Sequence, residues 1–542
     1  MKTLIFILLL VPMMSYGQST FIRHYTAASP WGANSSPICG VASTDSSYFL
    51  YGGSPESASN GLLDLFLMKC SQDGTPIWTK TYGDQDPNMN EYPTDMKYTS
   101  DNKIVLLSHK NLGSSNTTDI FVVKVDLSGD TLWTKTIGGP LSDYGLHIEE
   151  TTDLGYIISG HTYNFINPGY IGVYLIKLSS SGNLEWTKTY GGVNGGDQGM
   201  AVKQTNDGGF IICGMGEGIG NCIGGGGQPL LIKTDNLGNV EWTGSYGTIG
   251  GSAEDVIVTN DGGYLVTGVV SSSGPNPLSY LLKVSSNGAI EWVKGYEYNG
   301  YFASESILPI ADSTYMIYGF SSSPSNPNIA SLLIKVNSMG DILFTKEYTA
   351  GEAGNIIKPS LDNGILMVGD GGPNYGGLFI KTNMQGEVGC FVNNNTGVQV
   401  TSPTFLYCSD FAAEGTGGVI SNTQTKIGTF TPVSGLLCFQ EDCNTSSSIS
   451  AEGMGSYTAP SGAIYTTGGV YTDTIPNAAG CDSIITINLS MSHSGIGELN
   501  NSPKQLIKIV DVLGRETPFK PNTPLLYIYN DGTVERKMII KE

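Results

Sequence analysis

Residues 175–192 read LIKLSSSGNLEWTKTYGG, and the pattern within this stretch decides the fold. A lysine (Lys177) is followed five places later by a glycine (Gly182) and four places after that by a tryptophan (Trp186). The spacing occurs seven times, with the glycine at Gly74, Gly129, Gly182, Gly238, Gly288, Gly340 and Gly386. The last position holds Trp78, Trp133, Trp186, Trp242, Trp292, Phe344 and Cys390. A period of 46 to 56 residues built from short strands predicts a propeller or another radial repeat.

The third copy shows how each repeat is expected to fold. Apolar runs with β-type alternation cover residues 146–151, 156–160, 173–178 and 184–190, and short turns separate them. Polar residues such as Ser179 can bond a main-chain N–H group two places on, and Gly182 can adopt the positive φ that closes the turn. We expect Trp186 to pack in the wedge between neighbouring sheets, and Lys177 to form a local ion pair or cover apolar surface.

The count of strands predicts how the array closes. The sequence contains seven sets of the first three strands but eight copies of the fourth, and the extra copy is N-terminal. Because a closed array leaves no unpaired edge, we expect residues 21–27 to pair with the strand around residues 378–381. The prediction is an all-β chain in which residues 18–393 form a seven-bladed β-propeller closed by an N-terminal strand, followed by small β modules.

The ends and the charge of the chain indicate its destination. Residues 1–17 have the positive start, the apolar stretch and the small final residues of a signal peptide, and no other segment is apolar enough to span a membrane. The net charge of −21 argues against nucleic acid or an anionic membrane as a partner. Nine cysteines in an exported chain can form disulfides, and Cys390 with Cys438 is one candidate pair.

The repeat resembles the tryptophan-docking β-propellers of the quinoprotein-like group. It is most similar to the repeat propellers of exported Bacteroidetes proteins, which carry a Trp-Thr-Lys-Thr-Tyr-Gly-Gly signature as at residues 186–192. The resemblance implies a fold and not an activity, because propellers host many chemistries. After the propeller we expect a cysteine-bounded β extension at 394–443. Residues 449–492 resemble a short β module common in large Bacteroidetes surface proteins.

Residues 496–542 resemble the type A sorting domain of the type IX secretion system. An Asp-x-x-Gly-Arg turn and a basic C-terminal strand are hallmarks of that family, and the matching residues here are Asp511, Gly514, Arg515, Arg536 and Lys537. The resemblance implies a β-sandwich-like domain that an outer-membrane translocon and its sorting machinery recognise. It also implies a protein that is secreted or held at the cell surface. An ordinary small β domain is the alternative interpretation.

No motif in the chain nominates an active site. The sequence has no Gly-x-Ser-x-Gly, no His-Glu-x-x-His and no phosphate loop, and its five histidines share no local pattern. One set of acids does repeat at a fixed distance before the aspartate of the first turn in each repeat. Glu91, Asp143, Asp197 and Glu352 lie ten residues before that aspartate, and Glu254 and Glu305 lie seven before it.

These six carboxylates form the candidate site. The connections that carry them share one face of a propeller, so a ring at one channel mouth could hold Ca²⁺, a cationic ligand or a sugar. Alternatively, each acid bonds the N–H groups of its own loop and repeats because the loop repeats. Catalysis needs an unequal acid and base, so a repeat of like acids favours binding. We therefore predict a non-catalytic protein, without a cofactor, that binds glycan, polymer or protein. A secreted polysaccharide-acting enzyme is the alternative.

Overall fold

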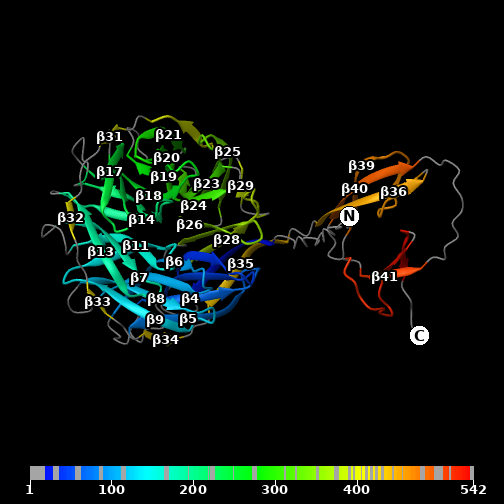
Figure 1. Ribbon diagram of the computed structural model, residues 1–542, viewed down its shortest axis with the longest axis horizontal. Coiled ribbons are helices and arrows are strands. Elements are labelled where there is room, and N and C mark those ends of the chain that lie inside the picture. Colours follow the sequence, from blue (N-terminus) through cyan, green and yellow to red (C-terminus); the bar gives the residue numbers. More distant parts are fainter. Residues whose placement is uncertain are drawn as a thin grey trace, which may run out of the picture. The chain divides into compact units, whose positions relative to one another are not determined.

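The computed structural model is all-β, with no α-helix among the residues that it describes (Figure 1). These are residues 19–27, 36–54, 63–84, 89–111, 117–163, 170–192, 195–217, 219, 226–247, 250–271, 277–298, 300–310, 313–323, 326–349, 353–370, 377–388, 392–394, 397–403, 406–408, 413–415, 419–421, 425–428, 432–441, 445–454, 456–476, 482–492, 505–511, 514–530 and 532–537. Within them no helix is long and apolar enough to cross a membrane.

Consecutive strands form antiparallel sheets along the chain. The first three sheets contain β2 (Ser36–Ala42), β3 (Tyr48–Ser54), β4 (Asp64–Cys70) and β5 (Pro76–Asp84); β6 (Glu91–Tyr98), β7 (Ile104–Asn111), β8 (Thr118–Val125) and β9 (Thr131–Gly138); and β10 (Asp143–Glu150), β11 (Tyr156–Thr162), β12 (Gly172–Leu178) and β13 (Leu184–Gly191).

The next three sheets repeat the arrangement. They contain β14 (Gln198–Gln204), β15 (Phe210–Gly216), β16 (Gln228–Thr234) and β17 (Val240–Gly247); β18 (Gly251–Val258), β19 (Tyr264–Val270), β20 (Leu278–Val284) and β21 (Ile290–Glu297); and β22 (Tyr301–Ile310), β23 (Thr314–Ser323), β24 (Asn326–Val336) and β25 (Ile342–Tyr348).

The seventh sheet joins the two ends of the array. It contains β26 (Ala353–Pro359), β27 (Ile365–Asp370) and β28 (Gly377–Thr382), and its next strand is the N-terminal β1 (Ser19–Ala27). Strand β1 pairs antiparallel with β28, with Phe21 opposite Lys381 and Tyr25 opposite Gly377. The pairing of the N-terminal strand expected from the sequence is therefore confirmed.

The seven sheets form a closed ring. The first strand of each sheet contacts the sheet before it, as β6 contacts β2 and β3, and the series ends where β2 contacts β26 and β27. Figure 1 shows the sheets arranged radially, with first strands such as β6, β14, β18 and β26 nearest the centre. This is a β-propeller-like fold, and its innermost strands surround a central channel.

A fifth strand completes every sheet on its outer side. These strands are β29 (Val392–Asn393), β30 (Gln399–Thr401), β31 (Leu406–Cys408), β32 (Ala413–Gly415), β33 (Val419–Ser421), β34 (Thr425–Gly428) and β35 (Pro432–Glu441). They join β25, β21, β17, β13, β9, β5 and β1 respectively. We call residues 392–441 the belt, because they pass round the outside of the ring in the reverse of chain order; β31 to β34 lie at its rim in Figure 1.

The belt overlaps the β extension that we expected at residues 394–443. The sequence did not indicate that this segment adds one strand to each of the seven sheets. Residues Ser19–Gln440 form one compact unit, so the belt belongs to the ring. The candidate disulfide between Cys390 and Cys438 involves side chains outside the described part of the structure. Cys39, Cys70 and Cys213 are buried free thiols.

The repeated turn has the geometry that its residues predict. Gly182 has a φ of 74°, and its N–H group donates a 2.9 Å hydrogen bond to the carbonyl oxygen of Ser179. In the preceding repeat, the Asp126 carboxylate accepts a 2.8 Å hydrogen bond from the N–H group of Ser128, two residues on. A side-chain acceptor and a left-handed glycine therefore close this turn, as expected.

The repeated aromatic residues join one sheet to the next. A Cβ atom added to Gly182 would lie 3.0 Å from the Trp133 ring of the preceding sheet, so the glycine admits the indole. The hydroxyl group of Tyr190 donates a 2.7 Å hydrogen bond to the carbonyl oxygen of Gly238 in the next sheet. Equivalent bonds join Tyr82 to Gly129, Tyr246 to Gly288, Tyr296 to Gly340 and Tyr348 to Gly386. The expected packing role of the tryptophans is confirmed.

The repeated lysines form ion pairs within their own sheets. Lys177 lies 2.8 Å from Asp153 in the first turn of its repeat, with only 5% of its side chain exposed. Lys69, Lys124, Lys233, Lys283 and Lys381 pair in the same way with Asp45, Asp101, Asp207, Asp261 and Asp362. These lysines stabilise the repeat and do not face the channel, which confirms the local role expected for them.

Residues Glu441–Glu542 belong to a second compact unit. One sheet contains β36 (Thr445–Met454), β40 (Asp482–Ser492) and β39 (Gly469–Pro476), and another contains β41 (Leu506–Val510), β42 (Leu525–Tyr529) and β43 (Val534–Lys537). Strands β37 (Tyr457–Thr458) and β38 (Ile464–Tyr465) form a hairpin.

Candidate ligand-binding channel

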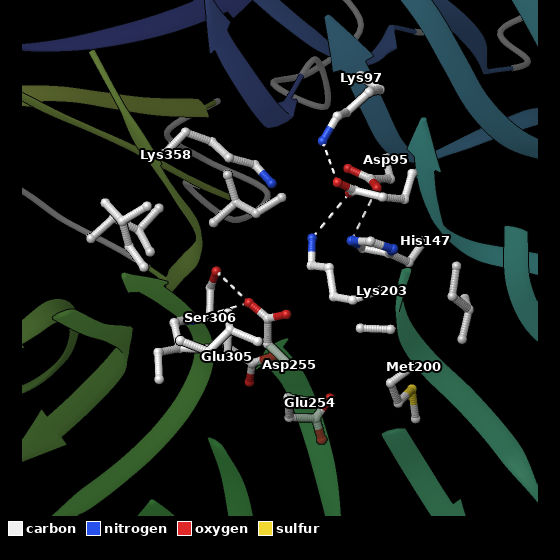
Figure 2. Close-up of a pocket in the computed structure, with 18 of the residues that line it drawn as sticks. Asp95, Lys97, His147, Met200, Lys203, Glu254, Asp255, Glu305, Ser306 and Lys358 are labelled. Atoms are coloured by element: carbon white, nitrogen blue, oxygen red, sulfur yellow. Dashed lines mark hydrogen bonds and ion pairs between the residues drawn. The ribbon is translucent and has the colours of Figure 1, made fainter. Parts of the chain in front are cut away.

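The central channel contains a cavity of about 750 Å³ (Figure 2). Its walls are the innermost strands of all seven sheets: β2, β6, β10, β14, β18, β22 and β26. This volume is typical of a pocket for a small organic ligand. The residues that face the cavity are therefore the candidate binding residues.

Each innermost strand carries a β-bulge at the same point, where one extra residue interrupts the register. A bulge redirects the side chain of the extra residue. The seven bulged residues are Ile38, Thr94, Leu146, Met200, Glu254, Glu305 and Asn355, and all of them line the cavity. One level of the channel wall is thus a ring of seven residues, of which two are acidic.

Glu254 and Glu305 are the two acidic bulged residues, and they lie on the contacting strands β18 and β22. Burial first, and the nearby charge of Glu254 second, together raise the pKa of Glu305 to about 8. Burial also raises the pKa of Glu254, against the hydrogen bond that it accepts from Ser252. Near neutral pH this pair therefore holds a proton and presents both a donor and acceptors to the cavity.

A second ring of residues lies three places after each bulge. Its members are Val41, Lys97, Glu149, Lys203, Ile257, Leu308 and Lys358, and all but Val41 line the cavity. The Glu149 carboxylate lies 2.6 Å from the ammonium group of Lys97 and 3.0 Å from that of Lys203, so it forms an ion pair with both lysines. Burial raises the pKa of Glu149, but the two lysine charges outweigh this and hold its pKa below the usual range.

Lys358 differs from the other two lysines of this ring. It projects into the cavity from β26 (Figure 2), and no side chain in the described residues forms an ion pair or hydrogen bond with its ammonium group. Burial lowers the pKa of Lys358, but the charges around it, with Asp95 first and Asp255 among them, raise it overall. Lys358 is therefore charged and has three N–H donors available to a ligand.

Residues one place after the bulge join neighbouring strands. The Asp95 carboxylate accepts a 3.0 Å hydrogen bond from the N–H group of Ile148 on the next innermost strand. Asp255 accepts an equivalent 3.0 Å bond from Ile307. His147 takes this position on β10, and burial lowers its pKa to about 4, so its ring is neutral. These groups stabilise the channel wall.

The structure brings together two of the six predicted site residues in the cavity, Glu254 and Glu305. Asp143 accepts a 2.8 Å hydrogen bond from the N–H group of Gly139, and Asp197 accepts one of 2.8 Å from the N–H group of Gly192. Both are fully buried, Asp143 at the start of β10 and Asp197 in the connection just before β14. For these two residues the loop-bonding alternative matches the observed contacts.

Glu91 is also buried, at the start of β6, and is not among the residues that line the cavity. Glu352 lies outside the described residues. The described residues contain no group of three or more histidine, cysteine, aspartate or glutamate side chains that could hold a metal ion.

Lys358, Lys97 and Lys203 line the cavity, but the repeat of acidic residues in the sequence did not predict them. A usable pattern was present. Each of these lysines lies four residues before the first-turn aspartate of its repeat, Asp362, Asp101 and Asp207 respectively. Since the turn fixes the register of the innermost strand, that offset selects the same wall position in every repeat.

The residues matched to the sorting domain lie in the second unit. The Asp511 carboxylate is 2.9 Å from Nε of Arg515, and the N–H group of Gly514 donates to the Asp511 carbonyl oxygen over 2.9 Å in a turn. Arg536 and Lys537 lie on β43. Lys537 donates a 3.0 Å hydrogen bond to the hydroxyl group of Tyr529.

No protein-family model matches this chain, and neither does any curated protein. Among solved structures it is similar to a protein of unknown function from Bacteroides caccae, at 9% identity over 60% of this chain and 93% of that one, with a TM-score of 0.33. A protein of unknown function from Dyadobacter fermentans matches at 10% identity over 57% and 98% of the two chains, with a TM-score of 0.36.

The quinohemoprotein alcohol dehydrogenase of Comamonas testosteroni also matches, at 9% identity over 67% of this chain and 68% of that one, with a TM-score of 0.35. At this level the likeness concerns the propeller-like fold alone.

Proposed function

We propose that this chain is a seven-bladed β-propeller protein that binds a glycan, polymer or protein segment in its central channel, without chemical turnover. One observation carries the proposal. The channel wall keeps charged groups directed at the cavity, Lys358 and the Glu254–Glu305 pair, instead of pairing them with one another. Polar groups in a cavity are costly unless they are hydrogen-bonded, and a ligand with complementary polar groups would provide those bonds.

The binding proposal is tested with the full chain in a glycan array and a metal-ion screen, alongside hydrolysis assays on the same polymers. We expect the parent protein to bind a ligand and the Lys358→Met variant, with its fold intact, to bind that ligand more weakly. Glu150→Gln is the matched control, because Glu150 also lines the cavity but is bonded by Ser100. Binding that both variants leave unchanged would place the ligand outside the channel.

The second candidate function is a polysaccharide-acting enzyme, and the Glu254–Glu305 pair favours it. Glycoside hydrolysis commonly uses two carboxyl groups, of which one has a raised pKa and acts as the acid. If the parent hydrolysed a polymer and both Glu254→Gln and Glu305→Gln abolished the hydrolysis, the protein would be an enzyme and not a binding protein.

We further propose that the protein is exported through a signal peptide at residues 1–17 and crosses the outer membrane by type IX secretion. The Asp511–Arg515 turn and the basic strand β43 support this, as does the grouping of residues after Glu441 in a unit of their own. Its partners would then be the translocon and its sorting machinery, and it would be secreted or held at the cell surface. Deleting residues 496–542 should retain the product in the periplasm, and a deletion product at the surface in normal amounts would refute the proposal.

A further inference from the structure

No lysine or arginine among the residues that the structure describes forms an ion pair with the acid pair of the channel, Glu254 and Glu305. The groups that act on Glu254 and Glu305 are each other, Asp255 and Ser252, and no lysine or arginine is among them. Lys97 and Lys203 are both occupied by Glu149. The pair is therefore an acidic site whose charge the described residues do not balance.

An aromatic pair lies beside these carboxylates. Tyr301, at the start of β22, stacks on Phe320 with a centroid distance of 5.3 Å and an interplanar angle of 23°. Burial raises the pKa of Tyr301, and the nearby charges of Glu305 and Glu254 raise it further. Tyr301 and Phe320 are not among the residues that line the cavity, so the two carboxylates themselves are the groups that would hold an organic ammonium group.

Lys358 indicates which chemical group of the same ligand would lie in another part of the cavity. Its ammonium group has no bonding partner among the described residues, but Asp95, Asp255 and Glu149 already balance its charge. An anionic ligand group would be repelled by these three carboxylates, whereas a hydroxyl oxygen would accept a hydrogen bond without adding charge. The cavity lining as a whole is acidic, with six carboxylates and three lysines in the part of the chain that the structure describes.

We propose that the channel binds a saccharide that carries a free amino group, with the ammonium held by Glu254 and Glu305 and hydroxyl oxygens bonded by Lys358. This inference rests on the proposed binding function and specifies its ligand. A sugar hydroxyl both donates and accepts, which also suits Asn355 and Thr94 in the bulge ring. The single amino group distinguishes the ligand from neutral glycans.

The test compares two oligomers that differ only at the nitrogen atom of each sugar unit. The full chain is titrated calorimetrically with the tetramer of glucosamine and with the tetramer of N-acetylglucosamine. The second oligomer has neutral acetamide groups in place of the ammonium groups and keeps the hydroxyl groups. We expect the amino form to bind about tenfold more tightly, since a desolvated charge pair adds a kilocalorie or more to binding. Glu254→Gln and Glu305→Gln should each reduce the preference for the amino form. Lys358→Met should lower the affinity for both oligomers.

Glu150→Gln is the matched control, because it removes one carboxylate from the cavity lining without touching the acid pair, and it should keep the preference. Thermal unfolding of each variant is recorded first, so that a loss of binding is not a loss of fold. Equal affinity for the two oligomers, or a preference that survives in Glu254→Gln and Glu305→Gln, would overturn the amino-sugar proposal and leave channel binding standing. If neither oligomer nor any ligand of the wider array bound, both proposals would fail.

Discussion

Tyr190 donates its hydroxyl hydrogen bond to the carbonyl oxygen of Gly238 over 2.7 Å, and this bond crosses from one sheet to the next. Gly238 has a φ of 77° and belongs to the turn that the repeat spacing defines. The donor lies four residues after Trp186, and the same strand therefore supplies both the ring that packs on this turn and the bond that fixes it. One short motif thus determines the turn and its attachment to the neighbouring sheet.

Tyr190→Phe should lower the free energy of unfolding by about 1 kcal/mol, because it leaves a buried carbonyl oxygen without its donor. Chemical denaturation measures the change. Tyr92→Phe is the control, since Tyr92 is 40% exposed, and its variant should be within about 0.5 kcal/mol of the parent. The chain itself has Ile137 at this position in β9, so the fold should survive, and a loss of folding would contradict the argument.

Asp362→Asn should destabilise the protein by about 3 kcal/mol, because it leaves the fully buried Lys381 without its ion pair. Asp130→Asn removes the partner of Lys80, whose pair is largely exposed, and should cost less than about 1 kcal/mol. Equal effects in denaturant titrations of the two variants would show that burial does not govern these pairs.

Glu305→Gln should change how stability depends on pH. A carboxyl group with a folded pKa of about 8 keeps its proton where the unfolded chain, with a value near 4.5, has lost it. The unfolding free energy contributed by Glu305 is therefore present at low pH and declines from about pH 4.5 to pH 8. The variant lacks this decline, so its stability relative to the parent should rise between pH 5 and pH 8.

The groups facing Glu305 are Glu254, Asp255 and Tyr301, so none of them provides a compensating positive charge. Thermal unfolding of the parent, Glu305→Gln and Glu150→Gln at pH 5 and pH 8 isolates the effect. A constant difference between the parent and Glu305→Gln at both pH values would contradict the assignment.

Ending the chain before the belt should cause association. A chain that stops at residue 389 lacks β29 to β35 and exposes the outer edge of every sheet, and unpaired edges pair with other chains. A chain that stops at residue 441 keeps the belt and should remain monomeric. Light scattering during size-exclusion chromatography compares the two, and a monomeric short chain would show that the belt does not protect these edges.

The ring of sheets could be predicted from the sequence because its determinants are local. Lys177, Gly182 and Trp186 each act within one turn or on the next sheet, and the repeat shows every position seven times. The belt has no such pattern. Its strands β29 to β34 contain two to four residues each, too few to show alternation, and their partners lie far away in the chain.

The candidate site could be predicted in part. Asp143 and Asp197, ten residues before the turn aspartate, lie at a strand start and in a connection, and both bond loop N–H groups. Those seven residues before it, Glu254 and Glu305, fall on the bulge and face the cavity. The two spacings were visible in the sequence, but their meaning depends on the bulge, which no sequence pattern indicates.

The belt also has a consequence for the timing of folding. It meets the sheets in the reverse of the order in which they are synthesised, so its last strand, β35, joins the first strand made, β1. That contact closes a loop of nearly the whole ring, and long-range contacts of this kind form slowly. The pairing of β1 with β28 can close the ring once residue 382 is made, but the outer edges of the sheets stay uncovered until residue 441 is available, and a nascent chain should be susceptible to proteases and to association at those edges up to that point.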